Sequence, residues 1–304
     1  MTGGRSAAIL GDQAVGVRTF VLDERIRYSY SAPVTDLCQY LRIVPPVVHG
    51  RQRRRRWELR VDRVASSTLR TFSDAWGNLT MAVNVGRVDE AVEFIVHVEV
   101  DVDTVGGPDT ANGRGGGSGS GGGAGAPPVP LRTGAFSPTR LTAADASMTR
   151  LTGDLGRGGG DVASLCERVH ASIAYEWGVT GVHTTAGEAL AGGRGVCQDY
   201  AHIMIAVCRL AGVPARYVSG HLTGEGGSHA WVEVLQPQPG GPSACGEGAP
   251  RRWQGWDPTH NRRTDADYLV VAVGSDYDDA APLWGTFDGD GVCSRLVVEK
   301  RLTT

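Results

Sequence analysis

Cys197 is the first of three residues in this sequence whose types could act together in acyl transfer. It lies where a glycine-rich turn, residues 192–195, enters an apolar segment. The start of a helix offers unpaired N–H groups and a positive dipole end, which stabilise a thiolate and can also receive an oxyanion. We therefore interpret Cys197 as a candidate nucleophile.

A cysteine nucleophile needs a base, and the base needs a group that orients it. His229 opens residues 229–234, whose pattern alternates as in a strand, and lies just after a glycine-rich turn, residues 224–227. Asp257 ends a short segment that Pro258 terminates. Both residues stand at the ends of predicted strands. The sequence therefore offers both a base and an orienting group.

The segment behind Cys197 is predicted to be a buried helix. Arg209 is the only charged residue in 200–211, and a helix that is apolar on nearly every side belongs in a core. Gly212 suits the left-handed position after the last turn, and Pro214 prevents continuation. A further helix is predicted at 161–173, and strands at 215–222, 230–235, 252–257, 268–273 and 296–299. Helices followed by consecutive strands predict an α+β module with an antiparallel sheet.

The rest of the chain divides by composition. Residues 17–105 contain alternating segments separated by turn signals, which predict a small antiparallel β domain. Residues 1–16 are predicted to be a disordered N-terminus. Residues 106–130, rich in glycine and serine, are predicted to be a flexible linker. Residues 131–304 then form the module that carries the three candidate residues.

Composition excludes several classes of function. The chain has 304 residues, enough for two modest domains, and its net charge of -3 gives no electrostatic reason to expect nucleic acid as a partner. No run of about 18 apolar residues predicts a membrane span, and residues 1–16 lack the pattern of a signal peptide. The six cysteines are scattered without a CxxC pair. Reduced thiols and a cytoplasmic location are therefore expected.

Four motifs carry a resemblance to a known family: residues 195–202, residues 214–220, His229-Ala230-Trp231 and residues 256–259. They resemble the bacterial transglutaminase-like cysteine protease family. The likeness extends to residues 274–279, to Pro282-Leu283 and, near the N-terminus, to residues 28–34, which resemble the separate β module of that family.

The resemblance implies a papain-like α+β core, with helices and an antiparallel sheet, preceded by a small antiparallel β domain. It also implies a catalytic Cys-His-Asp triad, which Cys197, His229 and Asp257 match. One departure is Ser275, where the family usually has arginine before Asp-Tyr. That difference concerns a surface or substrate contact and leaves the triad intact.

Other cysteine and histidine residues have simpler interpretations. Cys208 lies deeper in the predicted helix and is expected to be a core residue. His202 follows Cys197 by five positions, so it points away from the face of the thiol and is interpreted as structural. His221 and His260 are expected on the surface or at strand ends.

A metal site is the alternative that residue types leave open. Cys197, His202, His229 and Asp257 could ligate zinc, but no HExxH or CxxC pair supports such a site. We therefore expect neither a metal nor a cofactor.

The expected reaction is cysteine-dependent acyl transfer at an amide of a peptide or protein substrate. Water would make the protein a protease, peptidase or amidase, and this outcome is favoured. An amine would make it a protein-glutamine transglutaminase, because the same triad serves both outcomes. A non-catalytic scaffold that binds a peptide is the third alternative. A protein partner of the N-terminal β domain is not identified by the sequence.

Overall fold

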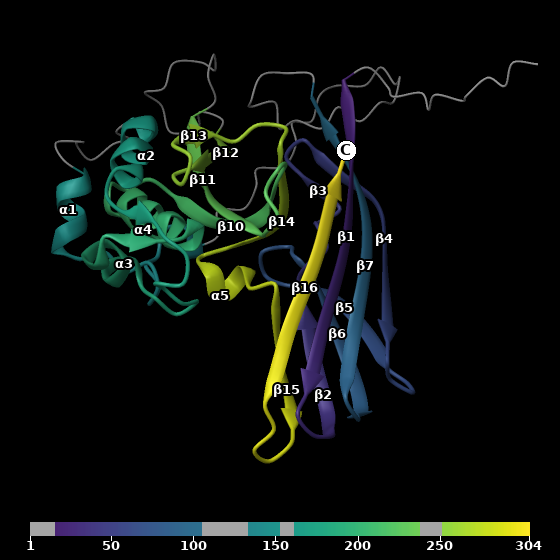
Figure 1. Cartoon of the computed structure of the whole chain (residues 1–304). Helices are drawn as coiled ribbons and strands as arrows, with labels where there is room; N and C mark the ends of the chain where they lie inside the picture. Colours follow the sequence, from purple (N-terminus) through teal and green to yellow (C-terminus); the bar gives the residue numbers. More distant parts are fainter. Residues whose placement is uncertain (1–15, 105–132, 153–160, 238–250) are drawn as a thin grey trace, which may run out of the picture.

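The computed structural model describes residues 16–104, 133–152, 161–237 and 251–304 (Figure 1). The predictions for residues 1–15 and for the linker at 106–130 lie outside these ranges. Among the described residues, no helix is long and apolar enough to cross a membrane.

The β module consists of two sheets that pack face to face around one core. Their strand orders are β16-β1-β7-β4-β3 and β15-β2-β6-β5. Inward positions alternate along β1, where Phe20, Leu22 and Ile26 are fully buried, as expected for a strand with one face on a core. The strands are β1 (Val17–Tyr30), β2 (Val34–Leu41), β3 (Val48–His49), β4 (Gln52–Asp62), β5 (Thr68–Ser73), β6 (Leu79–Val88), β7 (Ala91–Asp103), β15 (Leu283–Asp288) and β16 (Ser294–Thr303).

The last two strands differ from the sequence expectation. The strand predicted at 296–299 was assigned to the same module as Cys197, within 131–304. In the structure β16 pairs with β1, from Val21 opposite Thr303 to Tyr30 opposite Ser294, and β15 pairs with β2. The alternating pattern of a strand predicts that it needs a neighbour but not which strand supplies it. The β module is therefore built from both ends of the described chain.

The α+β module, residues 133–280, carries the helices and a third sheet with strand order β13-β12-β11-β10-β14. In Figure 1 the helices lie on one side of this sheet and the β module lies on the other. The order of helices and antiparallel strands confirms the predicted α+β class. The elements are η1 (Thr133–Ala135), α1 (Ala146–Thr152), α2 (Val162–His170), β8 (Ala174–Tyr175), α3 (Ala186–Gly192), β9 (Arg194–Gly195), α4 (Cys197–Leu210), β10 (Ala215–Leu222), β11 (His229–Pro237), β12 (Arg251–Asp257), β13 (Arg262–Arg263), β14 (Tyr268–Gly274) and α5 (Tyr277–Ala280).

Helix α4 is the centre of the α+β module. It is buried from Gln198 to Cys208 and packs on β10 and β11. The predicted stop signal is present, since Gly212 has φ +75° directly after the C-cap. The predicted core position of Cys208 is confirmed, because its side chain is fully buried.

Two side-chain amides of the β module close the outer edge of β14. Gln52 donates to the carbonyl of Val270 at 2.7 Å and accepts from its N–H at 2.9 Å. Asn78 does the same for Val273, with both hydrogen bonds at 2.8 Å. An edge strand exposes unpaired N–H and C=O groups that must be satisfied when buried. These contacts join the two modules through backbone that would otherwise lack partners.

Candidate active site

Cys197 is the first residue of α4 and is partly exposed. Strand β9, which leads to it, pairs in parallel with β8. The side chain of Asp199 turns back to accept the N–H of Val196 at 2.8 Å. A Cβ at Gly195 would lie 2.6 Å from that carboxylate, so this close turn requires glycine. The helix start is thus fixed. The N–H groups of Cys197 and Gln198 precede the first N–H that bonds back within the turn, which is that of Asp199 to the carbonyl of Val196 at 2.8 Å.

His229 and Asp257 are brought together by antiparallel pairing. His229 begins β11 and Asp257 ends the neighbouring strand β12, so both lie at the same end of the sheet. His229 Nε2 lies 2.8 Å from Asp257 Oδ2, and the two side chains are 3% and 0% exposed. Trp231 stacks against the His229 ring, with centroids 6.0 Å apart. The imidazole is therefore fixed by two contacts, the packing of its face against Trp231 and the contact of Nε2 with Asp257.

The charge of the site favours a protonated His229. Burial alone would lower the pKa of His229, but hydrogen bonds to Asp257 and Cys197 and the negative charges of both outweigh burial and raise it to about 10. Because Nε2 contacts Asp257, Nδ1 is the nitrogen left for Cys197. The arrangement can hold a thiolate beside an imidazolium.

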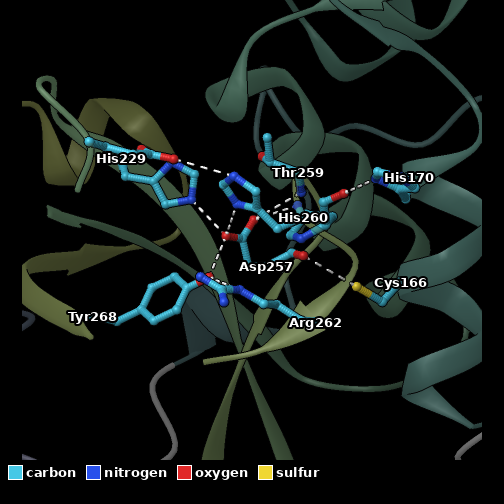
Figure 2. A network of polar contacts seen from close by, with 10 residues as sticks. Cys166, His170, His229, Asp257, Thr259, His260, Arg262 and Tyr268 are labelled. Atoms are coloured by element: carbon cyan, nitrogen blue, oxygen red, sulfur yellow. Dashed lines mark hydrogen bonds and ion pairs between the residues drawn. The ribbon is translucent and has the colours of Figure 1, made fainter. Parts of the chain in front are cut away.

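Asp257 receives hydrogen bonds on both oxygens (Figure 2). Oδ1 accepts the backbone N–H groups of Thr259 and His260. Oδ2 accepts from His229, from His260 Nδ1 at 2.7 Å and from the Tyr268 hydroxyl at 2.7 Å. Burial would raise the pKa of Asp257, but these donors, His229 foremost, hold it well below its usual value. The carboxylate therefore stays charged and fixed.

Sequence reasoning missed two further residues of the site. His260, expected at the surface or a strand end, is 38% exposed yet contacts Asp257. Glu225 contacts His229 Nδ1 at 3.3 Å and His260 Nε2 at 3.3 Å. The available signal for His260 was its position three residues after Asp257. Glu225 lies in a glycine-rich turn, where no pattern singled it out.

His170 lies beside this network, with its Nδ1 3.1 Å from the carbonyl of Pro258 (Figure 2), whereas His202 and His221 contact other residues. His202 is fully buried, and its Nε2 accepts the N–H of Tyr277 at 3.2 Å. Burial, with Arg209 and Arg140, lowers the pKa of His202 to about 3; the ring is therefore neutral, in agreement with a structural role. His221 lies near the end of β10, one of the two expected positions, and is buried there because β10 is covered on both faces.

The geometry around Asp257 is that of hydrogen bonds. Within the described ranges, ligand atoms of His229, Asp257 and His260 lie within 4.8 Å of one another. A tetrahedral zinc ion holds nitrogen ligands at about 2.0–2.1 Å, which separates neighbouring ligand atoms by roughly 3.3 Å. Both histidine nitrogens lie closer than this to Asp257 Oδ2, at 2.7 and 2.8 Å. His202 is not part of the cluster, so the four-residue metal site considered from sequence is not assembled.

Two other cysteines, on α2 and α4, are more deeply buried than Cys197. Cys166 and Cys208 are fully buried, and burial raises the pKa of each thiol to about 12. Ser275, where an arginine was expected, is also buried; its carbonyl accepts Arg209 Nη2 at 2.8 Å.

Comparison with known families decides the classification. Residues 148–258 match the transglutaminase-like superfamily core, and residues 22–101 match the bacterial transglutaminase-like N-terminal region. The chain contains a transglutaminase-like superfamily core. The transglutaminase-like core begins within α1 and ends just beyond Asp257, so it contains Cys197, His229 and Asp257.

Relatives of this transglutaminase-like chain are known from mycobacteria. An uncharacterized protein of Mycobacterium leprae is 38% identical over 147 residues, which cover 45% of this chain and 48% of that protein. An uncharacterized protein of Mycobacterium tuberculosis is 36% identical over 132 residues, 40% of each. The matched stretch therefore spans less than half of these relatives.

A solved structure shares the whole fold. A candidate cysteine protease from Cytophaga hutchinsonii aligns with a TM-score of 0.66 at 18% identity, over 94% of this chain and 91% of that one. At this identity the likeness establishes the fold.

Proposed function

We propose that Cys197, His229 and Asp257 form a catalytic triad that hydrolyses an amide bond in a peptide or protein substrate. The observation that carries the proposal is the buried 2.8 Å contact between His229 Nε2 and Asp257 Oδ2, with Cys197, at the start of α4, as another hydrogen-bond partner of the same imidazole. The match to the transglutaminase-like core and the description of the Cytophaga hutchinsonii neighbour support it.

The reaction proceeds in two halves. The Cys197 thiolate attacks the amide carbonyl carbon, a C–S bond forms, and N–H groups at the start of α4 receive the oxyanion. The proton on His229 Nδ1 passes to the leaving amine as the C–N bond breaks, which leaves a thioester. Water then attacks the thioester and gives its proton to His229, and the C–S bond breaks. Asp257 keeps the imidazole in one tautomer and orientation throughout.

Transfer to an amine is the second candidate function, because the thioester can be resolved by either nucleophile. A scaffold without catalysis is the third. Its weakness is that a binding surface has no chemical need for three residues arranged as a nucleophile, base and orienter.

The test begins with labelling by iodoacetamide near pH 7, with Cys293→Ala as the control because Cys293 is exposed. We expect stoichiometric labelling at Cys197, loss of that label in Cys197→Ala, and protection of Cys166 and Cys208. Peptide libraries and glutamine donors with a fluorescent primary amine follow. Cleavage without amine incorporation supports hydrolysis, whereas incorporation supports a transglutaminase. Peptide binding by a protein whose Cys197 resists labelling would support the scaffold instead.

A further inference from the structure

Glu225 joins the two histidines of the site. It lies in the turn between β10 and β11, and its side chain is 35% exposed. Its two oxygens divide between two rings: Oε2 lies 3.3 Å from His229 Nδ1, and Oε1 lies 3.3 Å from His260 Nε2. This carboxylate therefore faces the nitrogen of His229 that serves Cys197.

His260 completes a closed ring of contacts. Its Nδ1 lies 2.7 Å from Asp257 Oδ2, the oxygen that also contacts His229. Figure 2 shows both imidazoles converging on Asp257, and the centroids of the two rings are 5.3 Å apart. Each imidazole thus lies between the same two carboxylates, one buried and one at the mouth of the site.

We propose that Glu225 and His260 are positioning residues for His229, with His260 holding the Glu225 carboxylate where it orients Nδ1 of the imidazolium toward Cys197 and the substrate. The proposal rests on the proposed function. It adds to the triad a second carboxylate that acts on the base from the opposite side to Asp257.

The charged groups around His229 determine how strongly Glu225 affects the protonation of its imidazole. His229 faces three anions or potential anions, Asp257, Glu225 and Cys197. The rings of His260 and Tyr268 also lie beside it, with centroids 5.3 and 6.2 Å away, and both contact Asp257. A carboxylate this close to Nδ1 favours the protonated ring, although exposure to water weakens the effect. Its removal should make His229 lose its proton at a lower pH.

Two more groups act on Glu225 from neighbouring elements. Tyr175 on β8 lies within electrostatic range of Glu225 and Cys197. Lys300 on β16 also lies in range of Glu225, and its Nζ contacts His221 Nδ1 at 2.9 Å. Neither group is altered by the variants below, so both are constant in the comparison.

The experiment measures the alkylation rate of Cys197 against pH in the full chain, which requires no known substrate. Glu225→Gln keeps the size of the side chain and removes its charge. Glu225→Asp keeps the charge, and Glu176→Gln is the matched control. Glu176 is an exposed carboxylate whose backbone N–H bonds the carbonyl of Gly195, two residues before Cys197, but its side chain pairs with Arg194 at 3.2 Å. Iodoacetamide and iodoacetate are compared, because only the second is repelled by a carboxylate.

We expect the alkaline limb of the profile, which reports loss of the His229 proton, to move down by about one pH unit in Glu225→Gln. The rate ratio of iodoacetate to iodoacetamide should rise about three- to tenfold. Glu225→Asp keeps the carboxylate, so its pH profile and its rate ratio should stay close to those of the parent. Glu176→Gln should leave both quantities unchanged. Adding Glu225→Gln to His260→Gln should change the profile less than it does in the parent, because the two residues act as a unit.

Three outcomes would overturn the inference. One is a Glu225→Gln profile identical to that of the parent. Another is an equal shift in Glu176→Gln, which would indicate general surface charge. The third is faster alkylation of Glu225→Gln at every pH while the alkaline limb stays at the same pH. That result would indicate that the Glu225 side chain only obstructs access to the thiol. Absence of Cys197 labelling in the parent would instead contradict the proposed function, so the two failures are distinguishable.

Discussion

Asn78 of the β module and Val273 of the α+β module exchange two hydrogen bonds of 2.8 Å across the boundary between the modules. The asparagine side chain is 1% exposed and takes the place of a neighbouring strand. Since β14 also pairs with β10, which begins the hairpin that leads to His229, the β module supports the sheet on which the candidate base lies.

Asn78→Ala should destabilise the whole chain. It leaves the N–H and C=O of Val273 buried without partners, which costs about 1–3 kcal/mol for each group. We expect the free energy of unfolding to fall by roughly 2–4 kcal/mol in denaturant titrations. Asn84→Ala, an exposed asparagine on β6, is the control and should change it by less than about 0.5 kcal/mol. Equal effects of the two variants would show that the amide is not needed.

Cleavage in the linker should leave the two fragments associated. A site for a specific protease inserted after Ser120 would divide the chain between β7 and the core. Because β16 and β15 pair with β1 and β2, the second fragment contributes strands to both sheets of the first. We expect the fragments to co-elute in size-exclusion chromatography with unchanged helix signal. Separation without denaturant would contradict this pairing.

The acid sensitivity of the chain should depend on Glu233. Burial alone would raise the pKa of Glu233, but the charges of His49 and Arg216 outweigh burial and lower it to about 2. A depressed folded-state pKa stabilises the protein above about pH 4.5, and this contribution is lost as the pH falls toward 2. Between pH 6 and pH 3 the loss from this group is roughly 2 kcal/mol.

His49→Gln removes the largest favourable charge on Glu233, with which His49 is in contact at 2.7 Å. The folded-state pKa of Glu233 should then rise, so the stability lost between pH 6 and pH 3 should shrink by about 1 kcal/mol. Denaturant titrations at both pH values measure this difference. His97→Gln, which removes a more exposed histidine that contacts Asp23, is the control. Identical pH dependence in His49→Gln and the parent would count against the assignment.

The three triad residues should contribute unequally. Cys197→Ala and His229→Ala should reduce turnover to the level left by binding and oxyanion contacts. Asp257→Asn keeps the size but loses the charge and can hold the wrong tautomer, a change that costs about 10⁴-fold in serine enzymes. A preformed thiolate–imidazolium pair needs less help, so we expect a loss of order 10–10³-fold.

Pre-steady-state acylation on the single variants and on Asp257→Asn combined with Cys197→Ala measures these effects. The double variant should resemble Cys197→Ala, because residues that act as a unit are strongly non-additive. Asp257→Asn also places an amide N–H₂ among donors from His229, His260 and Tyr268, so its stability is measured as well. An Asp257→Asn protein as active as the parent would remove Asp257 from the mechanism.

The helix ends of the core were determined locally by the sequence. Asp161 caps α2 by accepting the N–H of Ala163, and Thr185 and Glu188, three positions apart, form a capping box at the start of α3. Gly212 ends the segment of α4 as predicted. These signals depend on residues within one turn of each other, so no tertiary information is needed to interpret them.

The proximity of His229 and Asp257 was also within reach of the sequence. Both stand at strand ends, and antiparallel neighbours in sequence place such ends side by side. The contact between these two side chains required only that β11 and β12 pair with each other.

Only the tertiary structure decided the surroundings of the triad and the partners of the terminal strands. Glu225 and His260 are ordinary polar residues in turns, and they become part of the site because two loops meet above Asp257. Strand β16 carries a pattern that several sheets could accept, and it joins β1 because that edge is open to it. A local pattern specifies which face of an element is buried, whereas the identity of the partner depends on contacts between residues far apart in the chain.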